Sequence, residues 1–141
     1  MILLYASTLS LHQYLASQLP HVKFILPTAP TQPVTLNMGM SMPSWYDIIG
    51  LDSRSNEVCN GLDDSTDRIL GLLEDEVTTD SSDTSEGPVC KPNIDYSRVV
   101  LAGFSQGGAL ALYTGMTGMR RKQSDNNGLG LAGIVLMLLS V

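Results

Sequence analysis

The sequence predicts an α/β fold in which helices flank a parallel β-sheet. Three apolar runs of strand length alternate with two helical stretches, in the order strand, helix, strand, helix, strand, which is typical of a parallel sheet. The run that ends at Gly103 is rich in β-branched residues, and a small, apolar, helix-competent run follows it. With 141 residues, 43% hydrophobic and 16% charged, the chain has the composition of a globular protein. We therefore expect a single domain over residues 1–141.

The first elements follow from apolar spacing and from prolines. Residues 4–19 carry apolar side chains at helical spacing, and Pro20 is expected to end that helix. Residues 22–26 form a short apolar run, which Pro27 and Pro30 close. This pattern predicts a buried strand.

Residues 28–47 combine prolines with apolar side chains. Pro30, Pro33 and Pro43 exclude a helix across the stretch, and we expect no regular element there. The stretch is nevertheless too rich in Met, Leu and Trp for a solvated loop. Two interpretations stay open, namely a wall of an apolar cavity and a cover over the edge of the sheet.

The middle of the chain divides into a helix and a polar segment. Residues 62–77 carry an apolar stripe, which predicts an amphipathic helix with Asp63 and Asp64 near its positive end. Residues 78–93 are polar, acidic and of low complexity. We expect them to form a disordered surface loop.

The C-terminal part predicts the remaining three elements. A strand ending at Gly103 leads into a helix that is expected to run to about Gly118. Residues 119–130 then form a polar, glycine-containing link, and residues 131–141 predict a fully buried strand.

Charge and cysteine content exclude several classes of function. The net charge of −6 argues against nucleic-acid binding, because phosphate contacts need clustered Lys and Arg. Cys59 and Cys90 stand in no metal-ligand spacing, so no metal site is expected. The longest apolar run, residues 129–141, is shorter than the about 20 residues that a membrane span needs.

The candidate chemistry lies at the end of the predicted strand. Gly103, Ser105 and Gly107 form a Gly-x-Ser-x-Gly pentapeptide between strand and helix, which is the context of a nucleophile elbow. Glycines suit the sharp turn because they bring the least bulk close to the serine. The N-terminus of the outgoing helix favours developing negative charge, and the N–H of Gln106 is expected to be an oxyanion donor. The alternative is an ordinary glycine-rich turn.

Five stretches of the chain match a known pattern, namely Leu-Pro-His-Val-Lys-Phe at 19–24, Pro-Thr-Ala-Pro at 27–30, Pro-Val-Thr-Leu-Asn-Met at 33–38, Met-Pro-Ser-Trp-Tyr-Asp-Ile at 42–48 and Gly-Phe-Ser-Gln-Gly-Gly-Ala at 103–109. With these stretches the chain resembles the acyl-protein thioesterases, in the lysophospholipase/carboxylesterase branch of the α/β-hydrolases. The resemblance covers most of residues 19–77 and 94–141. It implies an incomplete three-layer α/β-hydrolase domain.

The resemblance also implies an activity and a site. The activity is cleavage of long-chain acyl thioesters from S-palmitoylated proteins, with oxygen esters such as lysophospholipids as further substrates. Ser105 would be the nucleophile and Gln106 an oxyanion donor, without cofactor or metal. Five side chains would line the acyl channel: Leu36, Met38, Ile48, Ile49 and Leu51. The expected location is the cytoplasm, with the nucleus as a possible additional location, and at most peripheral contact with membranes.

The sequence departs from this family in its catalytic base. A serine hydroxyl needs a histidine to take its proton, and α/β-hydrolases place the acid and then the histidine after the serine. Here Asp125 is the one acid after Ser105, and we do not assign it to the triad. Both histidines, His12 and His21, precede the serine. From the predicted strand, His21 is expected roughly 16 Å from Ser105, at the other end of the sheet.

The chain also lacks the His-Gly-x-Gly-Asp segment that supplies the second oxyanion donor in the family. We therefore expect the central part of a hydrolase, truncated at both ends. The alternatives are a catalytically inactive fragment that binds acyl chains, and an interaction protein that uses the acidic segment.

Overall fold

The structure is a computed structural model that describes residues 2–4, 9–52, 58–77, 96–123, 131 and 133–137. The predictions for the acidic loop at 78–93, for Cys90 and for Asp125 lie outside these residues.

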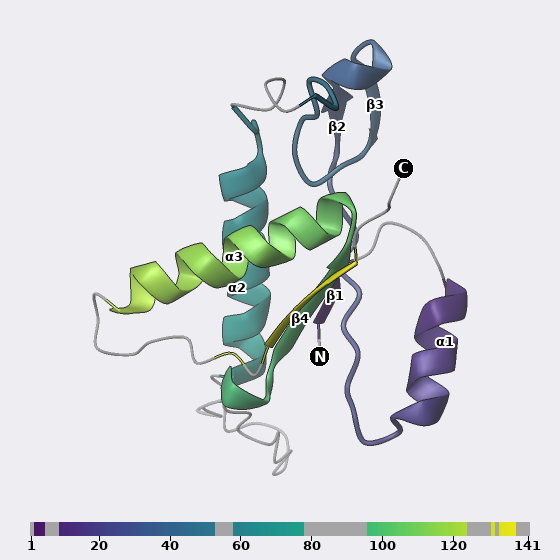
Figure 1. The fold of residues 1–141 in the computed structure, drawn as a ribbon, viewed down its shortest axis with the longest axis vertical. Coiled ribbons are helices and arrows are strands. Elements are labelled where there is room, and N and C mark those ends of the chain that lie inside the picture. The colour runs from purple at the N-terminus through teal and green to yellow at the C-terminus, as the bar shows by residue number, and fades with distance from the viewer. Residues whose placement is uncertain are drawn as a thin grey trace, which may run out of the picture.

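A parallel three-stranded sheet forms the centre of the fold (Figure 1). Strand β4 (Val100–Phe104) lies between β1 (Ile2–Leu4) and β5 (Gly133–Met137), and both neighbours run parallel to it. Leu101 and Ala102 are buried in the central strand. The predicted parallel sheet is confirmed.

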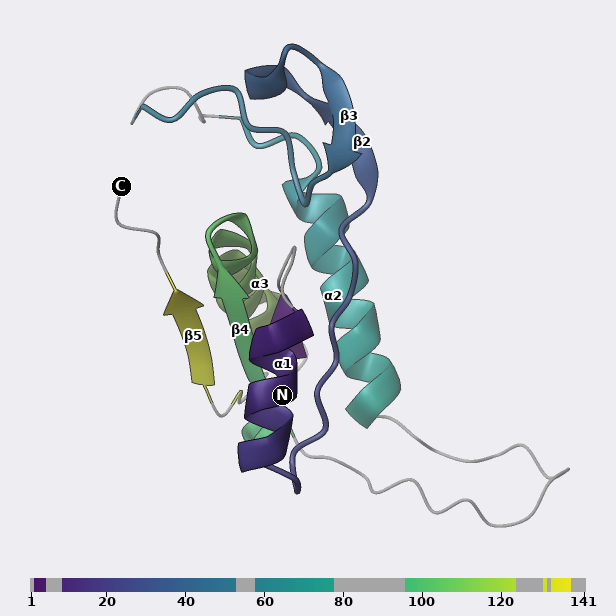
Figure 2. The same cartoon turned by 90° about the vertical axis from the view of Figure 1, so that its right-hand side faces the viewer.

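Helices pack on the sheet and on each other. Helix α3 (Gln106–Gln123) contacts all three strands, and α2 (Leu62–Val77) packs against α3. In Figure 2, α2 and β5 lie on opposite sides of α3. Helix α1 (Leu9–Gln18) stands apart from the other two helices in Figure 1. The most deeply buried large hydrophobic side chains come from α2, β4, α3 and the segment after residue 43, and they form one core: Trp45, Ile69, Leu73, Leu101 and Leu110.

The proline-rich stretch contains a β-hairpin, so the prediction of no regular element there was wrong. Strand β2 (Thr31–Val34) pairs antiparallel with β3 (Met40–Pro43), and a 3-10 turn, η1 (Thr35–Asn37), connects them. Each strand carries a proline and has only one partner in this sheet. A strand with a free edge tolerates proline, because the missing N–H need not face a partner.

The first strand of the sheet is not the predicted one. Residues 22–26 are irregular apart from an isolated bridge at Ile25, whereas Ile2–Leu4, in part expected as helix, pairs with β4. Ile25 still packs against the core. The apolar run at 22–26 therefore reflects burial of side chains rather than sheet pairing.

The other boundaries agree with or extend the predictions. Helix α2 has the predicted bounds, and Gly61 at φ +87° provides the turn that leads into it. Helix α3 continues past the expected end at Gly118 to Gln123. Strand β5 lies inside the predicted run of residues 131–141, but Gly133 and Ile134 are half-buried rather than fully buried.

Candidate functional site

Ser105 occupies the single-residue turn between β4 and α3. Its φ is +50°, in the left-handed region that residues other than glycine seldom adopt, and its side chain is exposed. The Ser105 carbonyl accepts a hydrogen bond from the Ala109 N–H at 3.1 Å, which starts the hydrogen-bond ladder of α3. The backbone thus holds the hydroxyl at the carboxyl end of the central strand, in front of a helix N-terminus.

The lack of a side chain at Gly103 allows the chain to turn this sharply. A Cβ placed on Gly103 would collide with the backbone carbonyl of Gly107 and with the backbone nitrogen of Gly108. These atoms belong to the first turn of α3 and have no rotamer by which to move away. Strand and helix approach so closely only because position 103 carries no side chain.

The first turn of α3 presents polar backbone groups beside Ser105. Gln106 is the first residue of the helix, so its N–H and those of the next residues lack partners within the helix. The positive end of the helix dipole adds to the potential there. No acidic residue lies in this first turn to offset that potential.

The Gln106 side chain connects the serine turn to the segment Ser44–Tyr46. Its Oε1 accepts from the Trp45 N–H at 3.0 Å, and its Nε2 donates to Ser44 Oγ and to the Tyr46 carbonyl, both at 2.7 Å. Sequence reasoning assigned Gln106 only a backbone role and missed these contacts. The available signal was a polar residue at the start of a helix whose first residues are otherwise small and apolar. The neighbouring sequence gives no indication of which residues this side chain contacts.

Asp47 and Tyr46 extend this segment toward the hairpin. The Asp47 carboxylate accepts from both the N–H and the Oγ1 of Thr35, each at 2.7 Å. These hydrogen bonds from Thr35 hold the pKa of Asp47 below its usual range. Burial raises the pKa of Tyr46, and Cys59 adds to the effect.

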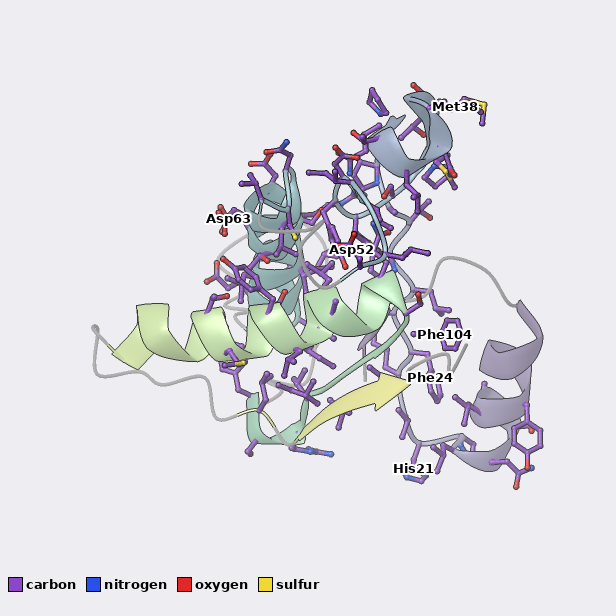
Figure 3. The ribbon with its side chains drawn as sticks, turned by 45° about the horizontal axis from the view of Figure 1, so that its top comes forward. His21, Phe24, Met38, Asp52, Asp63 and Phe104 are labelled. Carbon is purple, nitrogen blue, oxygen red and sulfur yellow. The ribbon has the colours of Figure 1, made fainter. Side chains whose placement is uncertain are left out.

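The five predicted acyl-channel residues lie on and beside the hairpin. Leu36 and Ile48 are brought together, since the Leu36 N–H donates to the Ile48 carbonyl at 2.7 Å. Met38 and Leu51 are 90% and 84% exposed, and Met38 lies at the outer end of the hairpin in Figure 3. Ile49 is 42% exposed.

A hollow of about 530 Å³ beside the start of α2 is lined by other residues, including Cys59, Asp63 and Tyr113. The Tyr113 hydroxyl donates to Asp63 Oδ1 at 3.0 Å across it. None of the five predicted acyl-channel residues lines this hollow.

The described histidine side chain does not adjoin the serine turn. His21 is exposed, in the turn after α1, and Figure 3 shows it well separated from Phe104, the neighbour of Ser105. His12 lies in α1, and its side chain is outside the described part of the chain. Among the described residues, no group of three or more His, Cys, Asp or Glu could hold a metal ion.

A family model described as phospholipase/carboxylesterase matches residues 6–125. The chain belongs to this family. Acyl-protein thioesterase 1 of Mycosarcoma maydis is 50% identical over 100 residues, which is 70% of this chain and 40% of that protein. Acyl-protein thioesterase 1 of Cryptococcus neoformans is 40% identical over 121 residues, covering 86% of this chain and 43% of the relative. The chain thus spans about two fifths of these phospholipase/carboxylesterase family members.

Solved structures share the fold of this chain. Acyl-protein thioesterase 2 of Zea mays matches 96% of this chain and 54% of its own with a TM-score of 0.65 and 25% identity. A variant of SOBER1 from Arabidopsis thaliana matches 81% of this chain and 52% of its own, with a TM-score of 0.63 and 22% identity.

Within the described residues, no helix has the length and apolar character to cross a membrane.

Proposed function

We propose that this chain carries the nucleophile of a serine hydrolase that cleaves long-chain acyl thioesters from S-acylated proteins, and oxygen esters as further substrates. The observation that carries the proposal is Ser105 at φ +50° between β4 and α3. The relatives named acyl-protein thioesterase support the substrate class.

In the proposed reaction Ser105 Oγ attacks the thioester carbonyl. The carbonyl oxygen takes up negative charge, and the N–H of Gln106 at the start of α3 stabilises it. The C–S bond then breaks, and the cysteine sulfur leaves with the proton given up by the serine. Water hydrolyses the acyl-serine ester, which releases the fatty acid and returns the hydroxyl.

The proton transfer needs a base, and the sequence has no histidine after Ser105. The described imidazole, that of His21, lies away from the serine turn. We therefore expect slow turnover from the 141-residue chain.

The test uses the full chain, an S-palmitoyl peptide and a fluorophosphonate probe. We expect the probe on Ser105, located by mass spectrometry of the digested protein, and hydrolysis that Ser105→Ala abolishes. Ser17→Ala makes the same chemical change on the exposed face of α1 and should match the wild type. Hydrolysis by Ser105→Ala at the wild-type rate would refute the role of Ser105.

The second candidate function is acyl-chain binding without catalysis, which the separation of the described His21 from the serine turn favours. It predicts that palmitate binds to the chain while neither probe labelling nor peptide hydrolysis depends on Ser105. Labelling of Ser105 together with Ser105-dependent hydrolysis would rule this candidate out.

A further inference from the structure

We infer that the Gln106 side chain is a positioning residue that ties the acyl-binding wall to the nucleophile turn, and so helps to set how well a long acyl chain binds. The inference rests on the proposed function, because it assumes that the hairpin side of the molecule holds the acyl chain.

The first step is the contact between the turn and segment Ser44–Tyr46. Gln106 follows Ser105 directly, and its amide uses both its oxygen and its nitrogen on three groups of that segment at 2.7–3.0 Å. Two of the three partners are backbone groups, so the contacts fix the backbone path of segment Ser44–Tyr46 and not only a side-chain rotamer. Ser44 and Trp45 are 3% and 1% exposed.

The second step is that the segment is held from its other sides as well. The Gln32 side chain donates to the Ser44 carbonyl at 2.7 Å, and the Ser65 hydroxyl donates to the Trp45 carbonyl. The Ser44 N–H donates to the Pro30 carbonyl at 2.9 Å. Hairpin, α2 and serine turn therefore meet on these residues, and Gln106 provides the contacts from the turn.

The third step leads from the segment to the predicted acyl-binding residues. Asp47, the next residue, holds Thr35 through two hydrogen bonds, and Ile48 accepts from the Leu36 N–H. Ile48 is thus two residues from the Tyr46 carbonyl that Gln106 holds, and Leu36 is connected to Ile48 by that hydrogen bond. Loss of the Gln106 amide should let this wall shift relative to Ser105, and a long chain should lose more contact than a short one.

The test replaces the amide with an apolar group of similar size. Gln106→Leu keeps the backbone N–H and removes all three side-chain hydrogen bonds, whereas Gln18→Leu makes the same change on exposed α1. Trp45 is the chain's one tryptophan and is 1% exposed, so its emission reports the segment directly. Titration with palmitate and with octanoate, followed by Trp45 emission and by calorimetry, measures chain-length preference without catalysis.

We expect Gln106→Leu to shift Trp45 emission to longer wavelength and to lower the ratio of palmitate to octanoate affinity about tenfold, which corresponds to about 1.4 kcal/mol. Gln18→Leu should change neither. Gln106→Glu keeps the acceptor for the Trp45 N–H but cannot donate when ionised. Its ratio of palmitate to octanoate affinity should therefore lie between those of Gln106→Leu and Gln18→Leu.

An unchanged affinity ratio in Gln106→Leu would overturn the inference, whether or not Trp45 emission moves. Wild-type protein that binds no palmitate would overturn it too, because there would be no acyl wall to position. Failure of the proposed hydrolase function is seen separately, as hydrolysis or labelling that does not depend on Ser105.

Discussion

The variant Gly103→Ala tests whether the serine turn requires a residue without a side chain. The same substitution at a glycine elsewhere shows what replacing a glycine does to stability in general. The Cβ of Gly103→Ala would overlap backbone atoms of Gly107 and Gly108, which belong to the first turn of α3. Overpacking in a close-packed site typically lowers the free energy of unfolding by about 1–3 kcal/mol. Backbone atoms can move aside less than side chains can, so we expect Gly103→Ala to lose about 3 kcal/mol.

Gly71→Ala provides the matched control. Gly71 lies inside α2, and a Cβ there meets no heavy atom within 4 Å. Alanine is better than glycine in a helix interior by about 0.5–1 kcal/mol, so this variant should be more stable than the wild type. The same substitution is thus expected to act in opposite directions at the two positions.

Thermal and urea unfolding of the two variants and the wild type measure the difference. The combined separation of about 4 kcal/mol corresponds to roughly 10 °C or more in Tm for a chain of this size. Fluorophosphonate labelling of Ser105 should also fall in Gly103→Ala and not in Gly71→Ala. If Gly103→Ala unfolded at the wild-type temperature and were labelled normally, the close approach of strand and helix would not be a property of the protein.

Two further predictions concern the segment beside the turn and the core. Because its pKa is lowered in the fold, Asp47 adds stability that is fully present above the ordinary carboxyl pKa of about 3.9. That stability is lost as the pH falls through the folded-state pKa, and urea midpoints of Asp47→Asn should vary less with pH across the acidic range than those of the wild type. Leu73→Ala, at a side chain that is 1% exposed in α2, should cost about 2–5 kcal/mol in urea unfolding, whereas Leu51→Ala, 84% exposed, should cost almost nothing.

The elements that the sequence predicted well are those whose signal is local and periodic. Helix α2 has the bounds that its apolar stripe predicted, because the same residues that define the stripe pack against the core. The turn around Ser105 was predictable because small residues between a strand and a helix leave the chain few other paths. Its positive φ was not readable from residue type, since a serine carries no backbone signature of its own.

The elements that the sequence predicted poorly depend on partners far along the chain. Residues 22–26 have strand composition, but the place beside β4 belongs to β1. Pro33 and Pro43 would exclude a strand that hydrogen-bonds to neighbours on both sides. In the hairpin β2 and β3 pair with each other, so the prolines are tolerated. Gln106 contacts residues about 60 positions earlier, so no local pattern could have identified its side-chain role.

The strain at Ser105 and the hydrogen bonds of Gln106 are best understood together. A non-glycine residue in a sparsely populated backbone region costs about 1–3 kcal/mol and persists only where its surroundings fix it. Three part-buried hydrogen bonds at about 1 kcal/mol each are of the same size. They act on the residue next to the strained one, so relaxing the turn would rotate the Gln106 side chain away from Trp45 and Ser44. The segment that carries the predicted acyl wall thereby helps to hold the serine in its exposed position, and the turn in return fixes that segment.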